Sequence, residues 1–588
     1  MAWCWLHRKC WVKSYTMSDK KAPGTAAAPL NVVLYWHMHQ PEYRDLRNGA
    51  YHLPWTYLHT IKDYVDMAAH LEENEEARAV VNFAPVLLEQ IDDYAHQLDG
   101  YLNHGKALRD PLLTALADPV FTLDHDKCMC LIKACLRANR QRLIERFEVF
   151  HQLADMAEAA IKKPEILNYY SEQYISDLLV WYHLAWMAET VRIRDERIIQ
   201  LMEKARHFNL HDRHRLIEVI AELISGVIGR YRTLAEAGRI ELTMTPYAHP
   251  IVPLLIDMES ARQAMPDAPL PSARNYPAGM TRSRWHMHKG IEIFQKYFGF
   301  PPSGCWPSEG SISNEAIELC DEMGVSWLAS GETVLRNSLN KNDIDVGECI
   351  HQAYQYRDKS VAAFFRDDGL SDLIGFKYSD WHADDAVANL VHNLEEIASS
   401  CIDKPEAIVS IILDGENAWE YYPENGYHFL SALYDKLAEN ENINLTTYSE
   451  YLDRHDERVE LKDIVAGSWV YGTFSTWIGE KDKNRAWDML VDAKQEYDRV
   501  IESGKLSQAE VQLAEMQLAT CESSDWFWWF GEYNSAESVA SFDEQYRLHL
   551  GNLYQLLKVE PPDYLSKAFS FGSGHPVKGG AMLPGQQA

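Results

Sequence analysis

The sequence predicts an α/β protein built around a parallel barrel, with a helical insertion and a mainly helical C-terminal region. Three observations predict this fold class. Short runs of apolar and β-branched residues alternate with stretches of helical periodicity. Polar side chains follow directly where most of these runs end, as they do at the carboxyl ends of barrel strands. From about residue 90 to 236, and again after residue 440, helical patterns predominate.

Seven runs are predicted to be the barrel strands. Most are separated by a predicted helix, which favours parallel pairing through β–α–β units. The run Ala407–Leu413 organises the others, because it stops abruptly at Asp414, Gly415 and Glu416 and so carries acids to the mouth of a pocket. The seven runs are residues 31–36, 79–83, 238–245, 304–306, 325–329, 360–365 and 407–413.

The chain is expected to divide into a barrel over residues 31–440, which contains the insertion, and a helical C-terminal domain over 441–565. Residues 1–30 are expected to be a disordered or misassigned leader, since Met17 begins a polar, small-residue stretch that suits a natural start. The Gly/Pro-rich residues 566–588 are expected to form a disordered tail.

Composition excludes several classes of partner. The chain has 588 residues, of which 46% are hydrophobic and 11% aromatic, so it can bury a large core. A formal charge of -31 argues against nucleic acid and against an anionic membrane surface, because both would repel it. A neutral substrate fits better. The 18 Trp and 31 Tyr suit the apolar faces of sugars, although they are equally ordinary core residues.

Secretion and membrane insertion have no signal in the sequence. No stretch is apolar for long enough to span a bilayer, and residues 1–16 lack the apolar region of a signal peptide. A cytoplasmic location is therefore expected. Ten cysteines are too few for a disulfide scaffold in so long a chain. Cys128, Cys130 and Cys135 lack a matching second pair and are predicted to be reduced core thiols.

Acids and histidines at the predicted strand ends suggest two chemistries. Two carboxylates flanking a sugar would catalyse glycoside hydrolysis, one as proton donor and the other as nucleophile or base. His37 and His39 with an Asp would instead suit a metal for assisted hydrolysis or deacetylation. Spacing alone does not rank the acids, which are Glu309, Asp367, Asp368, Asp372, Asp414 and Glu416.

Five sequence blocks in order resemble the signature regions of glycoside hydrolase family 57, whose members act on α-glucans. The likeness extends from about Asn31 to Tyr564. The blocks are His39-Gln40-Pro41, Gly238-Arg239-Ile240-Glu241-Leu242, Trp306-Pro307-Ser308-Glu309, Leu413-Asp414-Gly415-Glu416-Asn417 and Asp525-Trp526-Phe527-Trp528.

This resemblance implies an incomplete (β/α)7 barrel, a C-terminal region that contributes to the site, and a retaining mechanism. Glu309 matches the nucleophile and Asp414 the general acid/base. A retaining pair should lie about 5 Å apart. No cofactor and no catalytic metal are expected. Residues expected around the sugar are His37, His39, Glu241, His249, Trp306, Glu416, Trp419, Trp469, Asp525 and Trp526; Trp477 is a further possible stacking platform, and Arg366 with Asp367 and Asp372 a supporting charged network.

The blocks around Glu309 and Asp414 look more like the α-amylase and amylopullulanase branch of the family than the branching enzymes. An α-glucan or malto-oligosaccharide is therefore the expected substrate, and hydrolysis of α-1,4 links the expected reaction. A 4-α-glucanotransferase or branching enzyme would use the same two acids. A relative that binds carbohydrate without catalysis is the third alternative. Oligomeric state cannot be read from the sequence.

Overall fold

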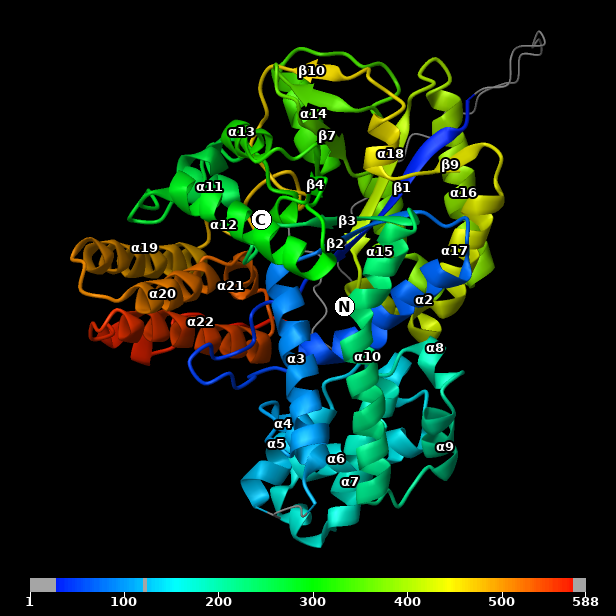
Figure 1. Ribbon diagram of the computed structural model, residues 1–588, viewed down its shortest axis with the longest axis vertical. Coiled ribbons are helices and arrows are strands. Elements are labelled where there is room, and N and C mark those ends of the chain that lie inside the picture. The colour runs from blue at the N-terminus through cyan, green and yellow to red at the C-terminus, as the bar shows by residue number, and fades with distance from the viewer. Residues whose placement is uncertain (1–27, 120–123, 575–588) are drawn as a thin grey trace, which may run out of the picture.

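The computed structural model describes residues 28–119 and 124–574. All seven predicted strands are present, and they lie in one sheet in the order β7-β5-β4-β3-β2-β1-β8 (Figure 1). Neighbouring strands of this series pair in parallel. The strands are β1 Leu30–Met38, β2 Ala79–Phe83, β3 Ile240–Met244, β4 Gly304–Cys305, β5 Trp327–Ser330, β7 Ala362–Phe365 and β8 Ile408–Asp414.

The sheet curls until its two ends meet. A single parallel bridge between Arg366 and Ser410 joins the end of β7 to β8, and the backbone N–H of Asp367 donates to the carbonyl of Ser410 at 2.8 Å. The expected incomplete (β/α)7 barrel is therefore confirmed. Three additional strands of three residues each were not predicted: β6 Tyr354–Tyr356, β9 Ile443–Leu445 and β10 Val459–Leu461.

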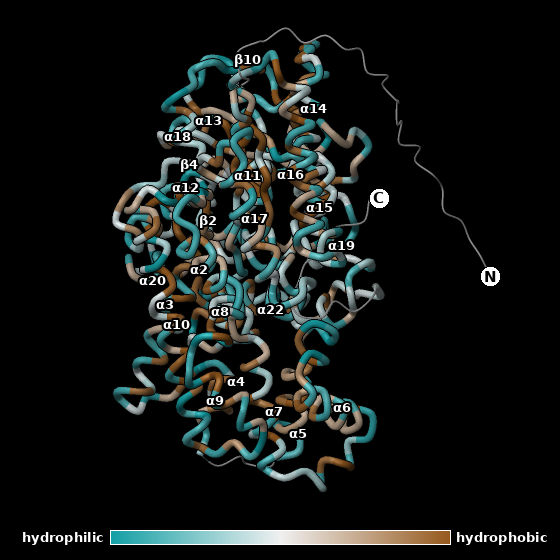
Figure 2. The backbone as a smooth tube through the Cα atoms, turned by 90° about the vertical axis from the view of Figure 1, so that its right-hand side faces the viewer, coloured by the Kyte–Doolittle hydropathy of each residue, from teal (hydrophilic) through white to brown (hydrophobic). Residues whose placement is uncertain are grey.

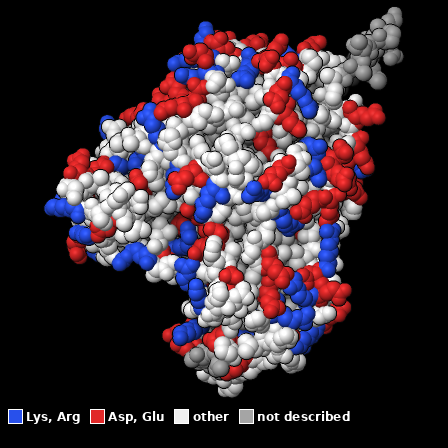
Figure 3. All heavy atoms as spheres, in the orientation of Figure 1, with Lys and Arg blue, Asp and Glu red and all other residues white. Residues whose placement is uncertain are grey.

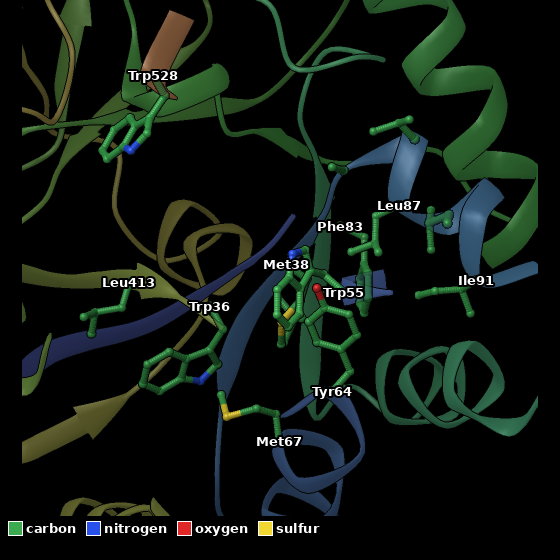
Figure 4. Packing of buried hydrophobic residues seen from close by; sticks show 14 of the residues in the cluster. Trp36, Met38, Trp55, Tyr64, Met67, Phe83, Leu87, Ile91, Leu413 and Trp528 are labelled. Atoms are coloured by element: carbon green, nitrogen blue, oxygen red, sulfur yellow. The ribbon is translucent and has the colours of Figure 1, made fainter. Parts of the chain in front are cut away.

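Alternation along the strands separates an inner core from an outer one. In β1, Val33 and Tyr35 face into the barrel and pack with Trp327. The intervening residues face the surrounding helices. Figure 4 shows Trp36 of β1 and Phe83 of β2 within this outer packing. Successive side chains of a strand point to opposite faces, so a strand buried on both sides is apolar throughout except where it enters a site.

Helices cover the barrel, extend below it and form a separate layer beside it (Figure 1). In Figure 2, where the backbone is coloured by hydropathy, hydrophobic segments run through the interior of the molecule. The insertion after β2 includes α3 Pro85–His104, α4 Pro111–Ala117, α5 His125–Cys135, α6 Glu148–Lys162, α7 Glu172–Ala185, α9 Glu196–Lys204 and α10 Leu210–Glu236. Barrel helices include α2 Val65–Glu73, α12 Gly279–Phe298, α13 Asn314–Glu322, α14 Glu332–Lys341, α15 Asp368–Phe376, α16 Ala383–Ser400, α17 Tyr427–Glu439 and α18 Tyr448–Leu452. The C-terminal helices are α19 Lys481–Glu502, α20 Gln508–Cys521, α21 Ser524–Trp529 and α22 Ala536–Leu556.

The predicted disorder of the tail is wrong for its first part. Gly574 forms a parallel bridge with Ser535, and the backbone N–H of Ser573 donates to the carbonyl of Glu532 at 2.9 Å. These contacts fix the chain as far as residue 574. The predicted leader, apart from residues 28–30, and the remainder of the predicted tail lie outside the described residues.

Two observations on the cysteines correct the sequence-based expectation. Cys349 and Cys401 form a disulfide, which no spacing rule indicated. Cys128 and Cys135 are buried free thiols as predicted, but the free thiol of Cys130 is exposed rather than in the core. In the described part of the chain, no helix combines the length and apolarity needed to cross a bilayer.

Candidate active site

The register of the strands places two expected site residues in one layer at the carboxyl end of the barrel. His37 of β1 lies opposite Asp414 of β8 on one side and Asn82 of β2 on the other. The Nδ1 of His37 is 2.7 Å from the Asn82 amide oxygen. Because both residues have the same strand parity as the inward-facing Tyr35 and Ile412, their side chains point into the barrel.

Glu309 reaches the same space from a turn rather than from a strand. After β4 the chain makes a short 3-10 turn, Ser308–Gly310, in which Glu309 has a φ of 60°. A non-glycine residue costs about 1–3 kcal/mol in such a conformation. Two contacts with one tryptophan hold the turn: the backbone N–H and the indole Nε1 of Trp469 donate to the carbonyl and the Oε2 of Glu309, each at 3.0 Å.

These side chains open onto one cavity of about 340 Å³. Of the residues expected at the site, His37, His39, Glu309, Asp414, Glu416 and Trp469 line it. The cavity wall also contains residues that the sequence did not single out as sugar contacts, among them Asp368, Phe376, Asn417, Tyr421, Tyr471 and Trp528.

Burial governs the protonation of the two candidate catalytic acids. It raises the pKa of both the Glu309 and Asp414 carboxyls. At Glu309, repulsion from Asp414 raises the pKa further, while the Trp469 donor acts in the opposite direction. At Asp414 a donor from Asn417, 2.7 Å from Oδ2, partly offsets the effect of burial. Because ionisation of Glu309 is opposed by a charged Asp414, a state in which only one of the two carboxyls is ionised is favoured.

Three histidines form a hydrogen-bonded stack beside the acids. Ser524 Oγ lies 2.8 Å from His249 Nδ1, and His249 Nε2 lies 3.2 Å from His37 Nε2. If His37 Nδ1–H donates to Asn82, every contact in this series is satisfied by neutral rings. Burial lowers the pKa of His37 to about 3 and that of His249 well below its ordinary value. Both rings therefore act as neutral hydrogen-bonding groups.

His39 links the stack to the C-terminal helices. Its ring lies 3.9 Å from that of His249 at an angle of 18°, and its Nε2 is 2.8 Å from Asp525 Oδ1. Ligand atoms of His39, His249 and Asp525 approach within 4.8 Å of one another, as metal ligands would. The rings are stacked, however, and their nitrogens already bond to Asp525, His37 and Ser524, which favours hydrogen bonding over metal binding. The Nδ1 of His39 is buried and has no partner among the described residues, so it is available to a ligand hydroxyl.

Glu416 follows Asp414 by two residues, lines the cavity and holds the segment that contains His39 and Gln40. Its Oε1 accepts hydrogen bonds from the His39 backbone at 3.2 Å and from Gln40 Nε2 at 3.0 Å. Between the two acids, a Cβ on Gly415 would lie 2.0 Å from the Sδ of Met38, so a larger residue there would require the buried Met38 side chain to move. Burial raises the pKa of Glu416 well above its ordinary value.

Glu241 lies away from the cavity, contrary to prediction. It faces into the barrel, but its register partner is Val80, one layer below the pair of Asn82 and Thr243. Its carboxylate accepts hydrogen bonds from Trp327 Nε1 at 2.7 Å and from the Ser449 backbone at 2.9 Å. Glu241 therefore ties the barrel interior to the start of α18. Glu241 therefore faces the barrel interior, but it lies too far below the carboxyl end of the barrel to reach the sugar site.

Several tryptophans expected at the sugar are core residues. Trp306 packs against Tyr35, His37 and Trp469 beneath the cavity. Trp419 packs on Trp36 and donates to the carbonyl of Gly415 at 3.0 Å. Neither lines the cavity.

The aromatic run in α21 is divided between core and cavity. Trp526 packs among α22 side chains and donates to the carbonyl of Thr520 at 2.7 Å. Trp528, two residues later, lines the cavity with its indole packed on the fully buried Trp477. In Figure 4 Trp528 lies apart from the packing around Phe83 and Leu87. Trp526, Phe527, Trp528 and Trp529 are adjacent, and four adjacent aromatics cannot all face one core. The sequence thus indicates that at least one of them lines a cleft, but not which one.

The expected charged network lines the same cavity. Arg366 donates to Asp368 at 2.9 Å and to Asp372 at 2.8 Å, and its guanidinium lies 5.5 Å from the Trp469 ring. Of the three predicted members, Arg366 and Asp372 form this network and Asp367 does not bond to Arg366. Asp367 instead accepts from the Leu370 backbone at 2.7 Å as the N-cap of α15 and bonds to His351.

A parallel barrel with two acids that line one cavity at its carboxyl end is the arrangement expected of a glycoside hydrolase. The sequence model of glycosyl hydrolase family 57 matches residues 33–464. The chain belongs to that family.

Known proteins agree with this assignment at low sequence identity. A putative alpha-amylase of Methanocaldococcus jannaschii is 22% identical over 47% of this chain, and a 4-alpha-glucanotransferase of Thermococcus litoralis is 22% identical over the same share. The matches cover 53% and 37% of those proteins, so the chain spans about half or less of the curated relatives it matches.

Two solved structures share the fold. A GH57 branching enzyme from Thermococcus kodakaraensis superposes with a TM-score of 0.53 at 15% identity, covering 90% of both chains. An alpha-amylase from Thermotoga maritima gives the same TM-score at 14% identity, covering 90% of this chain and 93% of that one.

Proposed function

We propose that the protein is a retaining α-glucan hydrolase that cleaves α-1,4-glucosidic links in glycogen, starch or maltodextrin. The observation that carries the proposal is the convergence of two carboxyls, the buried Glu309 and the partly exposed Asp414, on one cavity with Trp469, His37 and His39. Relatives named alpha-amylase support the substrate class. No cofactor enters the mechanism.

In the first step Asp414 donates its proton to the glycosidic oxygen while Glu309 attacks the anomeric carbon. A single proton on the coupled pair suits this division, because one acid must be protonated and the other ionised. The hydrogen bond from Trp469 Nε1 favours the ionised form of Glu309, whereas burial and the charge of Asp414 together raise the pKa of that carboxyl. The assignment of Glu309 as the nucleophile follows from its match to the family motif.

In the second step Asp414, now ionised, removes a proton from water, and the glycosyl–Glu309 ester is hydrolysed. Asn417 holds Asp414 through both steps by its 2.7 Å hydrogen bond. The unpartnered Nδ1 of the buried His39 is suited to accept a hydrogen bond from a sugar hydroxyl. His37, His249 and Asp525 position that ring rather than react.

Glucan transfer is the second candidate function, because relatives include a protein named 4-alpha-glucanotransferase and a structure of a branching enzyme. It uses the same two carboxyls and differs only in whether water or a sugar hydroxyl attacks the ester. A carbohydrate-binding protein without catalysis is disfavoured, since both acids line the cavity.

Product analysis with maltoheptaose, amylose and pullulan tests the proposal. We expect shorter oligosaccharides with new reducing ends from the first two substrates. Longer and shorter products without new reducing ends would show that the reaction is glucan transfer rather than hydrolysis. No products from any of the three would contradict both enzyme functions and leave sugar binding. Cleavage of pullulan alone would contradict the α-1,4 preference, because α-1,6 links are the distinguishing feature of that polymer.

A pair of tryptophan substitutions tests the assignment of the aromatic run. Trp528→Leu should raise KM for maltoheptaose about 5- to 10-fold, since it removes a cavity face that can stack on a sugar, with little loss in Tm. Trp526→Leu should leave KM unchanged and destabilise the fold by about 2–4 kcal/mol, because it truncates a buried core residue. Steady-state kinetics and thermal unfolding measure both, and the reverse pattern would refute the assignment.

A cytoplasmic setting and the absence of nucleic-acid and membrane partners remain predictions from charge and composition. Figure 3 shows acidic and basic side chains interspersed on one face, with no continuous basic patch there. An uncharged polysaccharide is compatible with such a surface.

A further inference from the structure

A compact sulfur–nitrogen cluster lies outside the active-site cavity. Cys349 and His351 stand two residues apart in the segment before β6, and Cys401 immediately follows α16. Both cysteines are 3% exposed. The two sulfurs and a ring nitrogen of His351 all lie within 4.8 Å of one another. In the structure the sulfurs are joined as a disulfide.

The histidine is oriented as metal-binding histidines are. Its Nε2 is 2.9 Å from Oδ2 of Asp367, whose other oxygen is fixed by the Leu370 backbone. Its Nδ1 is buried and has no hydrogen-bond partner in residues 28–119 or 124–574. A carboxylate bonded to one ring nitrogen, with the other nitrogen left without a hydrogen-bond partner, matches the usual outer-shell arrangement of zinc-bound histidine.

We propose that Cys349, His351 and Cys401 form a zinc site when the disulfide is reduced. Two thiolates and one imidazole are a donor set that zinc prefers, and a water completes four-coordination. Tetrahedral ligation at about 2.0–2.3 Å needs donor atoms about 3.5–3.8 Å apart, which lies inside the 4.8 Å spacing of the cluster. The sulfurs must separate from bonding distance to that spacing, which rotation of the two side chains can supply.

The exchange between the two states balances with a thiol reductant. Two reductant thiols reduce the Cys349–Cys401 bond, giving two protein thiols and one oxidised reductant disulfide. Zinc then displaces the two thiol protons and binds both sulfurs. Disulfide and metal therefore exclude each other at this cluster.

The cluster is connected to the wall of the cavity but is independent of its chemistry. Asp367, which holds His351, is also the N-cap of α15, and that helix carries Asp368 and Asp372 to the cavity. Metal binding at the cluster does not require that the protein act on glucans.

Zinc binding to the full-length protein, with and without a non-chelating phosphine reductant, tests the proposal. After equilibration with ZnCl2 and removal of free metal, the reduced protein should retain one more equivalent of zinc than the oxidised protein. Co²⁺ in place of zinc should give thiolate-to-metal charge-transfer absorption. Equal zinc content in the two redox states would overturn the proposal.

Single substitutions localise the metal. Cys349→Ser and Cys401→Ser should each abolish the additional equivalent, and Asp367→Asn, which preserves the cap, should weaken zinc affinity about 10- to 100-fold. His351→Gln should weaken it at least as much.

Cys128→Ser and Cys130→Ser together are the matched control and should leave zinc content unchanged. Retention of the equivalent by Cys401→Ser or undiminished affinity in His351→Gln would overturn the site, with far-ultraviolet circular dichroism verifying the fold of each variant.

Discussion

Glu309→Gln is expected to lose turnover of maltoheptaose by about 10⁴-fold or more, since it removes the proposed nucleophile. The fold should survive the change. Burial raises the pKa of the Glu309 carboxyl in the folded protein above that in the unfolded chain. The free energy of unfolding therefore falls as the pH rises from the unfolded pKa toward the folded pKa. The amide carries no charge, and Tm of the variant should match or exceed wild type by about 1–3 °C, more at pH 8 than at pH 5.

Asp414→Asn should show a different signature that separates the two roles. Loss of the proton donor is expected to cost about 10²–10⁴-fold with a natural glucan. With an activated aryl α-glucoside, whose leaving group needs no proton, the first step should be nearly unaffected and a burst of aryl alcohol should appear. Glu309→Gln should fail with both substrates.

Glu420→Gln is the matched control for both variants. Glu420 is 1% exposed and follows β8, the strand that ends at Asp414. Its carboxylate oxygens accept no hydrogen bond from any described residue, and it does not line the cavity. Rates for this variant should stay near wild type. Substantial activity of Glu309→Gln, or equal losses in all three variants, would remove Glu309 and Asp414 from their assigned roles.

Glu522→Gln is expected to be the most destabilising single substitution near the site. Arg282 donates to this carboxylate at 2.9 and 2.7 Å, and His286 Nε2 lies 2.7 Å from it. Arg282 and Glu522 are 5% and 1% exposed. Removing one partner of a buried pair leaves an uncompensated charge, which costs about 3–5 kcal/mol. Urea unfolding at pH 7 measures the change.

The pH dependence gives a second readout for Glu522. Burial opposes ionisation, but the charge of Arg282 and the contacts with Arg282 and His286 outweigh it and lower the pKa to about 2. A carboxyl whose folded pKa is depressed stabilises the fold above its unfolded pKa of about 4.3 and loses that contribution as the pH falls through the folded value. The difference in unfolding free energy between wild type and Glu522→Gln should therefore be full above about pH 5 and shrink toward pH 2.

Glu515→Gln is the matched control, because Glu515 approaches the same guanidinium at 3.8 Å with its side chain 31% exposed. Its loss should cost at most about 1 kcal/mol. Catalysis should also suffer in Glu522→Gln, since Glu522 precedes Ser524 and Asp525, which hold His249 and His39. Equal stability losses in the two variants would contradict the buried-pair account.

Local patterns in the sequence were enough to locate the seven barrel strands and the acids near their ends. A buried strand of a parallel barrel is apolar until it reaches the site, so the change from Leu413 to Asp414, or from Trp36 to His37, lies within two residues of the strand end. Alternation likewise gives the face on which each residue lies, and Glu241 does face inward. The family motifs then selected Glu309 and Asp414 from six candidate acids.

Only the tertiary structure decided how high in the barrel each site residue lies, which residues it contacts and whether it is in the core or at the cavity. Register with Val80 places Glu241 one layer below His37, although both face inward. Packing of α21 against α22 assigns Trp526 to the core and Trp528 to the cavity. Glu522 with Arg282, and Cys349 with Cys401, meet across 240 and 52 residues of chain. The physical reason is that strand parity is a local property of the backbone, whereas register and helix packing are set by contacts between segments distant in the sequence.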